Sequence, residues 1–271
     1  MSERYCVIGN PIAHSKSPLI HAAFALQTGQ QLVYERCLAP LDGFAATVTA
    51  LIGAGCKGAN VTVPFKLEAA TLASALTPRA RAAGAVNTLS FLDGEIVGDN
   101  TDGAGLVADI VRNGQHPIAG ARVLLLGAGG AARGALLPLL AERPASLIIA
   151  NRTLASAEAL AAQAGGDGAP VSASSFADLH GQFDLIVNAT AASLAGDVPP
   201  LPESVFGPGT LALDMMYGNQ PTPFMAVATA AGATARDGLG MLVEQAAEAF
   251  ALWRGVRPAT AAVLQQMRTN G

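Results

Sequence analysis

Lysine is scarce in this chain of 271 residues, and one lysine stands where it could do chemistry. Lys66 follows Asn60–Phe65, which reads as a strand end that leads into a helix. Sheets of α/β proteins bind their ligands at the carboxyl ends of strands. Asp102 lies in a small polar turn further along the chain, and a lysine–aspartate pair can supply a proton to the oxygen of a carbonyl group during its reduction. Taken alone, Lys66 is also consistent with an exposed lysine without a chemical role at the start of a helix.

Two other arrangements for alcohol and ketone chemistry are missing from the sequence. No lysine stands four positions after Tyr5, Tyr34 or Tyr217, so the chain has no Tyr-x-x-x-Lys pair. Its four histidines and three cysteines form neither a His-Glu-x-x-His nor a Cys-x-x-Cys pattern. We therefore expect no metal site, and we expect the cysteines to be reduced, buried side chains.

A glycine-rich turn in the second half predicts a dinucleotide site. The apolar run Arg122–Leu126 leads directly into Gly127–Ala132 and then into an alanine-rich helix. This is the G-x-G-x-x-G/A pattern in its required setting of strand, turn and helix. The pyrophosphate of a dinucleotide would meet the helix N-terminus. The residues expected to cradle it are Gly127, Ala128, Gly129, Gly130 and Ala131.

The next predicted strand ends in residues that favour NADP over NAD. An NAD enzyme usually carries an acidic residue there, which binds the ribose 2′-hydroxyl. Here the positions hold Asn151, Arg152 and Thr153. A guanidinium group can pair with a 2′-phosphate, and the threonine adds a hydroxyl donor.

Two serines flank Lys16 in the segment His14–Pro18. Pro18 suits the first position of a helix, and Ser17 then suits its N-cap. Capping alone would explain Ser17. Hydroxyl groups and free backbone N–H groups at a helix start also form a site for a carboxylate, so both interpretations of Ser15 and Ser17 stand.

Short apolar runs alternate with longer Ala- and Leu-rich stretches, which predicts an α/β protein with parallel sheets and helices on their faces. We expect a first domain at 1–102, a second at 103–238, and C-terminal helices at 239–271. The predicted strands are Tyr5–Ile8, Leu32–Cys37, Gly58–Val61, Val86–Leu89, Arg122–Leu126, Leu147–Ala150, Phe183–Val187 and Leu211–Leu213. The predicted helices are Pro18–Thr28, Gly130–Glu142, Thr153–Gln163 and Met241–Arg254, and Gly165–Ala169 reads as a surface loop.

Composition excludes several classes of protein. Hydrophobic residues make up 51% of the chain and charged residues 13%, so the chain can bury a large core. A net charge of −4 without a basic cluster argues against nucleic acid as a partner. No apolar stretch reaches the ~18 residues of a membrane span, and the N-terminus does not resemble a signal peptide. We expect a cytoplasmic protein.

Together these motifs resemble the shikimate dehydrogenase family, whose members use NADP to reduce 3-dehydroshikimate to shikimate. The resemblance covers essentially the whole chain. Its motifs are Gly9–Ile12, His14–Pro18, Gly58–Lys66, Gly84–Thr88, Gly98–Gly103, the glycine turn, Asn151–Thr153, Asn188–Thr190, Asp214–Tyr217 and Gly240–Gln245.

The resemblance implies an N-terminal α/β substrate domain, a Rossmann-type doubly wound dinucleotide domain, and a C-terminal helix that returns to the first domain. It implies that Lys66 is catalytic with Asp102 as its partner. It implies that Ser15, Ser17 and Tyr217 hold the substrate carboxylate. Contacts to ring hydroxyls, or positioning of the reacting groups, would come from Asn60, Thr62, Asn87, Asp102 and Gln245. Further cofactor contacts are expected at Ser156, Thr190, Met215 and Gly238.

Two positions depart from the family pattern. Ser156 stands where a second Arg or Lys is common, which weakens the expected clamp on the 2′-phosphate. Ala191 stands where serine is common, although Thr190 retains a hydroxyl group. The nearest alternative is therefore a quinate/shikimate dehydrogenase with relaxed use of NAD and NADP.

A catalytically silent sensor of the metabolite is an alternative of another class. The presence of Lys66, Asp102 and the glycine turn argues against it. We expect a small-molecule substrate, shikimate or 3-dehydroshikimate, with no nucleic-acid or membrane partner, and a monomer or homodimer.

Overall fold

The structure is a computed structural model that describes residues 2–164 and 169–269. The chain forms two compact units. The first unit runs to Gly105 and takes up the chain again from Val243, and the second unit is Leu106–Leu242. These divisions lie a few residues beyond the predicted 102 and 238. Of the predicted loop at 165–169, residues 165–168 lie outside the described residues.

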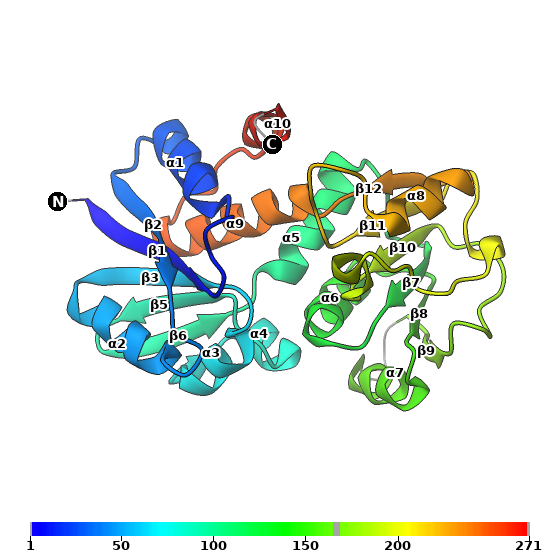
Figure 1. The fold of residues 1–271 in the computed structure, drawn as a ribbon, viewed down its shortest axis with the longest axis horizontal. Helices are drawn as coiled ribbons and strands as arrows, with labels where there is room; N and C mark the ends of the chain where they lie inside the picture. Colours follow the sequence, from blue (N-terminus) through cyan, green and yellow to red (C-terminus); the bar gives the residue numbers. More distant parts are fainter. Residues whose placement is uncertain (1, 165–168, 270–271) are drawn as a thin grey trace. The chain divides into compact units, whose positions relative to one another are not determined.

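The first unit is built on a six-stranded sheet with the order β2-β1-β3-β5-β6-β4 (Figure 1). Its strands are β1 (Glu3–Gly9), β2 (Leu32–Leu38), β3 (Cys56–Val61), β4 (Ala75–Leu76), β5 (Thr88–Leu92) and β6 (Glu95–Asp99). Its helices are α1 (Ser17–Thr28), α2 (Phe44–Gly53), α3 (Lys66–Leu72), α4 (Pro78–Ala83), the first part of α5 (Asp102–Ala108), α9 (Leu239–Arg254) from Val243 onward, and α10 (Ala261–Thr269).

The prediction of a parallel sheet is wrong for part of this unit. β1, β2 and β3 are parallel, but β5 runs antiparallel to both β3 and β6. Asp93 and Gly94 connect β5 to β6 with φ angles of 48° and 88°. Two successive positive φ angles form the tight turn that Asp-Gly favours between antiparallel strands. The Asp-Gly pair was therefore a hairpin signal that the alternation of apolar runs concealed.

Helix α9 packs against the first unit, as the resemblance implied. Trp253 near its end donates its indole N–H to the carbonyl of Leu89 on β5 at 3.2 Å. Gly58 on β3 makes room for this ring, because a Cβ at that position would lie 2.6 Å from the indole nitrogen. The rings of Tyr5 and Trp253 stack with centroids 4.7 Å apart. Figure 1 shows α1 and α9 on one face of the sheet and α2 and α3 on the other.

The second unit is built on a six-stranded sheet with the order β12-β11-β10-β7-β8-β9. Every strand pairing in it is parallel. The strands are β7 (Arg122–Leu126), β8 (Ser146–Ala150), β9 (Val171–Ser174), β10 (Leu185–Asn188), β11 (Leu211–Asp214) and β12 (Thr234–Arg236). The main helices are α6 (Gly130–Ala141), α7 (Leu154–Ala161) and α8 (Pro223–Ala230), and a π-helical turn, Asp109–Asn113, continues α5. This is the strand order of the doubly wound dinucleotide-binding fold.

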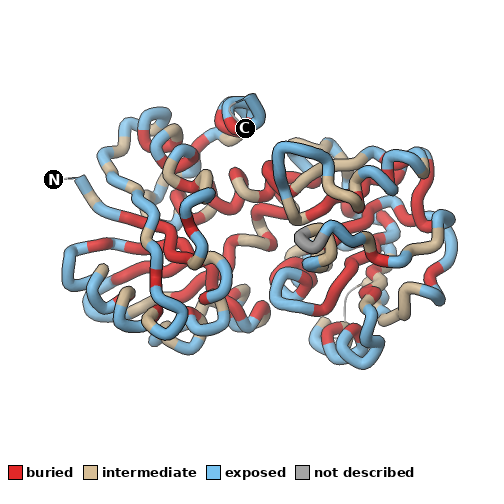
Figure 2. Tube along the Cα trace, in the orientation of Figure 1, coloured by how far each residue is buried: buried red, intermediate tan, exposed pale blue. Residues whose placement is uncertain are grey.

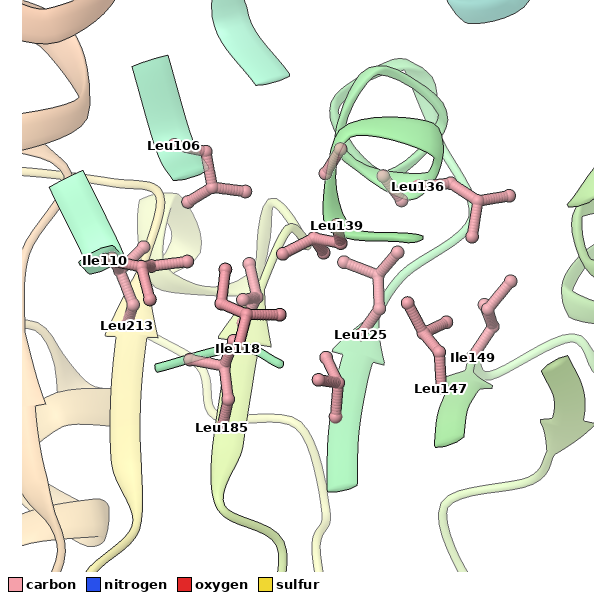
Figure 3. Close-up of a cluster of buried hydrophobic side chains, with 14 of the residues drawn as sticks. Leu106, Ile110, Ile118, Leu125, Leu136, Leu139, Leu147, Ile149, Leu185 and Leu213 are labelled. Atoms are coloured by element: carbon pink, nitrogen blue, oxygen red, sulfur yellow. The ribbon is translucent and has the colours of Figure 1, made fainter. Parts of the chain in front are cut away.

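Hydrophobic side chains cover both faces of the second sheet. Along β7, Val123 and Leu125 point into one core, whereas Leu124 and Leu126 point into the other. Figure 3 shows the first of these cores, where Leu106, Leu136 and Leu139 from the helices face the side chains of the strands. The central strands β7, β10 and β11 are buried except for Arg122 at the start of β7, whereas the outer helices keep exposed faces (Figure 2). The continuous apolar runs of the sequence follow from this double coverage.

Among the described residues, none of the helices combines the length and the apolar character that crossing a membrane requires.

Candidate active site

Lys66 and Asp102 lie together in the first unit. Lys66 is the first residue of α3, five positions after the last residue of β3, and Asp102 is the first residue of α5. Lys66 Nζ is 2.6 Å from Asp102 Oδ2, with side-chain exposures of 33% and 16%. The pair is partly buried, yet both groups remain accessible. A hydrogen-bonded ammonium group with open access can donate a proton to a developing alkoxide.

The amide of Asn87 links this pair to the C-terminal helix. Its Oδ1 accepts the backbone N–H of Thr101 at 2.8 Å, which fixes the orientation of the amide. Its Nδ2 therefore faces three acceptors, Asp102 Oδ1 at 2.8 Å, Thr101 Oγ1 at 2.9 Å and Gln245 Oε1 at 3.2 Å. Both oxygens of Asp102 thus accept hydrogen bonds, as expected of an ionised carboxylate.

Asn60, at the end of β3, extends the same network. Its Nδ2 donates to the carbonyl of Asn87 at 3.2 Å and to Thr88 Oγ1 at 3.0 Å. Thr88 Oγ1 in turn donates to Asn87 Oδ1 at 3.0 Å. Asn60, Asn87 and Thr88 are all buried, with exposures of 6%, 3% and 0%. Continuous hydrogen bonding of this kind holds each amide in one orientation.

A second, charged cluster fixes the backbone of the residues that precede Asp102 in the sequence. The carboxylate of Asp99 accepts two hydrogen bonds from Arg79, both 2.7 Å long, and one from Thr77 at 2.6 Å. Burial alone would raise the pKa of Asp99, but these hydrogen bonds and the charge of Arg79 bring it below its usual value. Asp99 Oδ1 also accepts the N–H of Asn100, whose own Oδ1 accepts the N–H of Asp102 at 3.1 Å. The start of α5 is therefore held from two sides.

The two serines lie at the start of α1, and of the two interpretations left open for Ser17 the structure does not support helix capping. Helix α1 begins at Ser17, its N-cap is Lys16, and no side chain caps it. The Ser15 hydroxyl accepts the backbone N–H of Ser17 at 3.3 Å instead. Arg36 on β2 donates twice to the Ser15 carbonyl, at 2.6 and 3.1 Å, and so orients the turn. The Ser17 hydroxyl does not cap the helix, and it interacts with the phenol of Tyr34.

Thr62 directly follows Val61, the last residue of β3. Its N–H donates to the carbonyl of Ile8 on the neighbouring strand β1 at 2.9 Å. Ser17, Asn60, Lys66 and Asn87 come from different parts of the first unit. Hydrogen bonds connect Asn60, Asn87 and, through Asp102, Lys66, and Ser17 reaches the same network through the phenol of Tyr34.

Three residues of this network had no role in the sequence analysis: Tyr34, Thr88 and Thr101. The Tyr34 hydroxyl donates to Asn60 Oδ1 at 2.7 Å. Thr88 and Thr101 are fully buried, and both contact Asn87. Both threonines stand inside the quoted motifs, and buried hydroxyl groups beside a predicted site were the available signal.

In the second unit, the glycine turn has the geometry of a pyrophosphate site. Gly127 has a φ of +102°, and a Cβ there would lie 3.2 Å from the Ala189 carbonyl, so only glycine fits. Gly129, the N-cap of α6, and Gly130 are exposed, and a Cβ on either would meet nothing within 4 Å. Open space therefore lies in front of the N-terminus of α6. Of the two alanines in this turn, Ala128 is buried and Ala131 is exposed. Phosphate oxygens fit such a place.

This turn stands at the point where the strand order reverses. β7 lies between β8 and β10, and Thr190 follows β10, with its hydroxyl bonded to Asn188 Oδ1 at 2.7 Å. A Cβ on Gly127 would lie 3.3 Å from the Thr190 methyl, so the two turns are adjacent. Open α/β sheets bind ligands in the crevice at this switch point.

The residues after β8 lie beside the glycine turn, because the N–H of Gly127 donates to the Ala150 carbonyl at 2.8 Å. Asn151 Nδ2 donates to the Thr153 carbonyl at 3.0 Å, and Thr153 is the N-cap of α7 without a side-chain capping bond. Arg152 is exposed and has no ion-pair or hydrogen-bond partner within residues 2–164 and 169–269. Ser156 is exposed on the first turn of α7. A guanidinium and two hydroxyl groups are thus available to a 2′-phosphate.

The loop after β11 carries Met215 and the exposed Tyr217. Asp214 orders this loop by accepting the N–H of Met216 at 3.0 Å and the hydroxyl of Thr222 at 2.6 Å. The N–H of Gly238 donates to the Met216 carbonyl at 2.9 Å, and a Cβ on Gly238 would collide with the carbonyl of Met215. All of these residues belong to the second unit, together with the glycine turn.

Comparison with protein families gives three matches along the chain. A family described as the shikimate dehydrogenase substrate binding domain matches residues 7–89. A family described as shikimate / quinate 5-dehydrogenase matches residues 109–195, and the shikimate 5'-dehydrogenase C-terminal domain matches residues 238–268.

Individual relatives match over their full length. Shikimate dehydrogenase (NADP(+)) of Herminiimonas arsenicoxydans is 64% identical over 100% of this chain and 98% of its own. An Ael1 enzyme from Pseudomonas putida superimposes with a TM-score of 0.94 at 51% identity, over 98% of both chains. A shikimate 5-dehydrogenase of Thermus thermophilus, crystallised with NADP(H) and shikimate, gives a TM-score of 0.87 at 33% identity, over 98% of this chain and 99% of the other. The two sheets, the paired lysine and aspartate, the glycine turn and these full-length relatives make this chain a member of the shikimate dehydrogenase family.

Proposed function

We propose that the chain catalyses the reversible, NADP-dependent reduction of 3-dehydroshikimate to shikimate. The observation that carries this proposal is the 2.6 Å contact between Lys66 and Asp102 inside a network of buried amides. A small polyhydroxy acid needs several oriented amide, hydroxyl and charged groups, and the first unit supplies them. The full-length relatives named NADP(+)-dependent shikimate dehydrogenase support the same activity.

We assign the substrate contacts as the family resemblance implies, and the chemistry of each side chain is compatible with its role. We assign the carboxylate of the substrate to Ser15 and Ser17, with Tyr217 as a third donor. Asn60, Thr62, Asn87 and Gln245 contact ring hydroxyls or hold the reacting groups. Lys66 and Asp102 meet the oxygen that changes between ketone and alcohol.

The reaction needs a hydride at the carbonyl carbon and a proton at its oxygen. When bound, the reduced nicotinamide supplies the hydride. The Lys66 ammonium stabilises the negative charge that develops on the oxygen and donates the proton, and in the oxidative direction the neutral amine accepts it. Asp102 holds Lys66 Nζ in place through Oδ2, while Asn87 holds Asp102 through Oδ1.

The cofactor residues are those of the second unit. We assign the pyrophosphate to the turn Gly127–Ala131 and the 2′-phosphate to Asn151, Arg152, Thr153 and Ser156. Thr190, Met215 and Gly238 complete the site. Because Ser156 brings no second cation, Arg152 carries the discrimination against NAD.

Apart from Tyr217, which belongs to the second unit, the residues that we assign to substrate binding and catalysis lie in the first unit, and those that we assign to the cofactor lie in the second. We place the enzyme in the cytoplasm, as a monomer or homodimer.

Initial rates in four mixtures test the proposal: NADP or NAD, each with shikimate or quinate. Fast reduction of NADP with shikimate alone supports it. Comparable rates with NAD, or appreciable turnover of quinate, would support the quinate/shikimate enzyme with relaxed cofactor use instead. Ligand binding without turnover in any mixture would support the metabolite sensor.

A further inference from the structure

The phenol of Tyr34 reaches a residue that we assign to the substrate. Tyr34 lies on β2 and Asn60 on β3, with β1 between them. The tyrosine hydroxyl crosses β1 and lies 2.7 Å from Asn60 Oδ1.

The direction of this hydrogen bond is fixed by the backbone. One amide atom of Asn60 lies 3.2 Å from the carbonyl of Asn87, which can only accept, so that atom is Nδ2. The atom facing Tyr34 is therefore Oδ1, and the phenol must donate. Burial raises the pKa of Tyr34 well above its usual value, against a smaller lowering by the Ser17 hydroxyl, so the phenol keeps its proton.

Packing holds the phenol ring independently of its hydroxyl. The ring stacks on His21 with centroids 4.0 Å apart and an interplanar angle of 5°. The ring of Trp253 occupies the space that the missing side chain of Gly58 leaves open, and its centroid lies 6.4 Å from that of Tyr34. A phenylalanine at position 34 would keep these contacts and lose only the hydroxyl group.

The remaining bonds of Asn60 determine what it can offer a substrate. Its two N–H groups are taken by the Asn87 carbonyl and by Thr88 Oγ1. Oδ1 has two lone pairs, of which Tyr34 occupies one. The ring of His21 also lies near this amide, but neither of its nitrogens makes a hydrogen bond among the described residues, so the second lone pair stays open. Asn60 can therefore accept a hydrogen bond from a substrate hydroxyl, and it cannot donate one to a substrate carbonyl without breaking the network.

We propose that Tyr34 is a positioning residue of this enzyme, which holds Asn60 as a hydrogen-bond acceptor for a ring hydroxyl of the substrate. This inference rests on the proposed function. It adds a residue outside the substrate-contacting set and specifies the hydrogen-bonding character that Asn60 presents.

The variant Tyr34→Phe tests the proposal in steady-state kinetics with shikimate and NADP. Loss of one neutral hydrogen bond should raise KM for shikimate about three- to tenfold. Because the bond does not involve the reacting oxygen, kcat should change less than about twofold, and KM for NADP should stay unchanged. Calorimetric titration with shikimate should show the same loss of affinity without turnover.

A double-mutant cycle separates positioning from a general structural effect. If Tyr34 acts through Asn60, Tyr34→Phe should add nothing to the loss that Asn60→Ala causes. Tyr5→Phe is the matched control, since Tyr5 also stacks on Trp253 but donates to Glu3 at 3.0 Å, outside the site. It should leave KM for shikimate unchanged.

Two results would overturn the inference: an unchanged KM and affinity in Tyr34→Phe, or an equal additional loss in the Asn60→Ala background. The failure of the proposed function would look different, because wild-type protein itself would then not turn over shikimate with NADP.

Discussion

At the scale of single residues, the charged pair of Lys66 and Asp102 is the chemically active feature of the first unit. The side chain of Lys66 is 33% exposed, and its ammonium nitrogen lies 2.6 Å from an oxygen of the Asp102 carboxylate. Loss of a positioned proton donor typically costs about 10²–10⁴-fold in rate.

We expect Lys66→Ala to lower turnover at least ~10²-fold, with a much smaller change in the dissociation constant for shikimate. Stopped-flow absorbance of NADPH and calorimetry measure the two quantities. Lys57→Ala, which removes an exposed lysine from β3, is the control and should keep wild-type turnover. Near-normal turnover of Lys66→Ala would eliminate Lys66 as the proton donor.

Arg152 determines the choice of cofactor in our proposal. Arg152→Gln should lower kcat/KM for NADP roughly ten- to hundredfold and leave that for NAD nearly unchanged, since only NADP carries the 2′-phosphate. Ser156→Arg should act in the opposite direction and strengthen the preference for NADP. Arg143→Gln, an exposed arginine before β8, is the control. Equal losses with both cofactors in Arg152→Gln would contradict the assignment.

The site residues that belong to recognisable motifs could be identified from the sequence, but the residues that hydrogen-bond those site residues and fix their orientation could not. Lys66, Asp102 and the glycine turn could be selected because their residue types and spacing are specific to a chemistry. Tyr34 could not, because its partner Asn60 is 26 positions away and is reached only across a folded sheet. Thr101 was also missed, since its hydrogen bonds to Asn87 depend on where α5 begins.

At the scale of elements, the strands of the second unit were predictable because they are buried on both faces. Leu124 and Leu125 are both fully buried, so the apolar run is continuous and easily recognised. β6 was missed because its outer part, Glu95–Val97, is exposed or half-buried and carries little apolar signal. The start of α1 was misassigned by one residue, since proline is accepted at more than one position of a first helical turn.

Helix α1 carries a buried histidine that makes the stability of the first unit depend on pH. The ring of His21 is fully buried, and this burial lowers its pKa to about 3, against a smaller opposing effect of Asn60. In the unfolded chain the pKa is about 6.5. As the pH falls below about 6.5, the unfolded state therefore takes up a proton that the folded state refuses, and stability is lost.

Between pH 7 and pH 5 this effect amounts to about 2 kcal/mol, which His21→Phe should remove from the pH dependence of the free energy of unfolding. Trp253, the single tryptophan, lies in the first unit and reports urea unfolding there by fluorescence. The control Phe24→Leu changes a buried neighbour of His21 without a titrating group, so it should lower stability equally at both pH values. An unchanged pH dependence in His21→Phe would contradict the role of this side chain.

At the scale of the whole molecule, the two units differ in how the chain forms them. The second unit is one continuous segment, Leu106–Leu242, whereas the first is made from both ends of the chain. The fold class could be predicted from the alternation of strands and helices. The exact divisions at Gly105 and Leu242 could not, because α5 and α9 each continue through a division without a break.

A fragment of Leu106–Leu242 should therefore fold alone and bind NADP with an affinity within about tenfold of the full chain, because its cores are complete. Circular dichroism during heating and calorimetry with NADP measure this. A fragment of residues 1–105 should show no cooperative transition, since α9 and Trp253 are missing from it. Cooperative unfolding of that fragment would show that the C-terminal helices are dispensable.

The return of α9 to the first sheet also has a consequence during synthesis. At about 5–20 residues per second, a ribosome needs roughly seven to thirty seconds to pass from Gly105 to the end of α9. Throughout that time the nascent N-terminal strands lack the helix that covers one of their faces, while the later-made segment can already close its own sheet. We therefore expect the second unit to complete its fold before the first, and we expect the N-terminal half of the nascent chain to depend more on chaperones than the middle part.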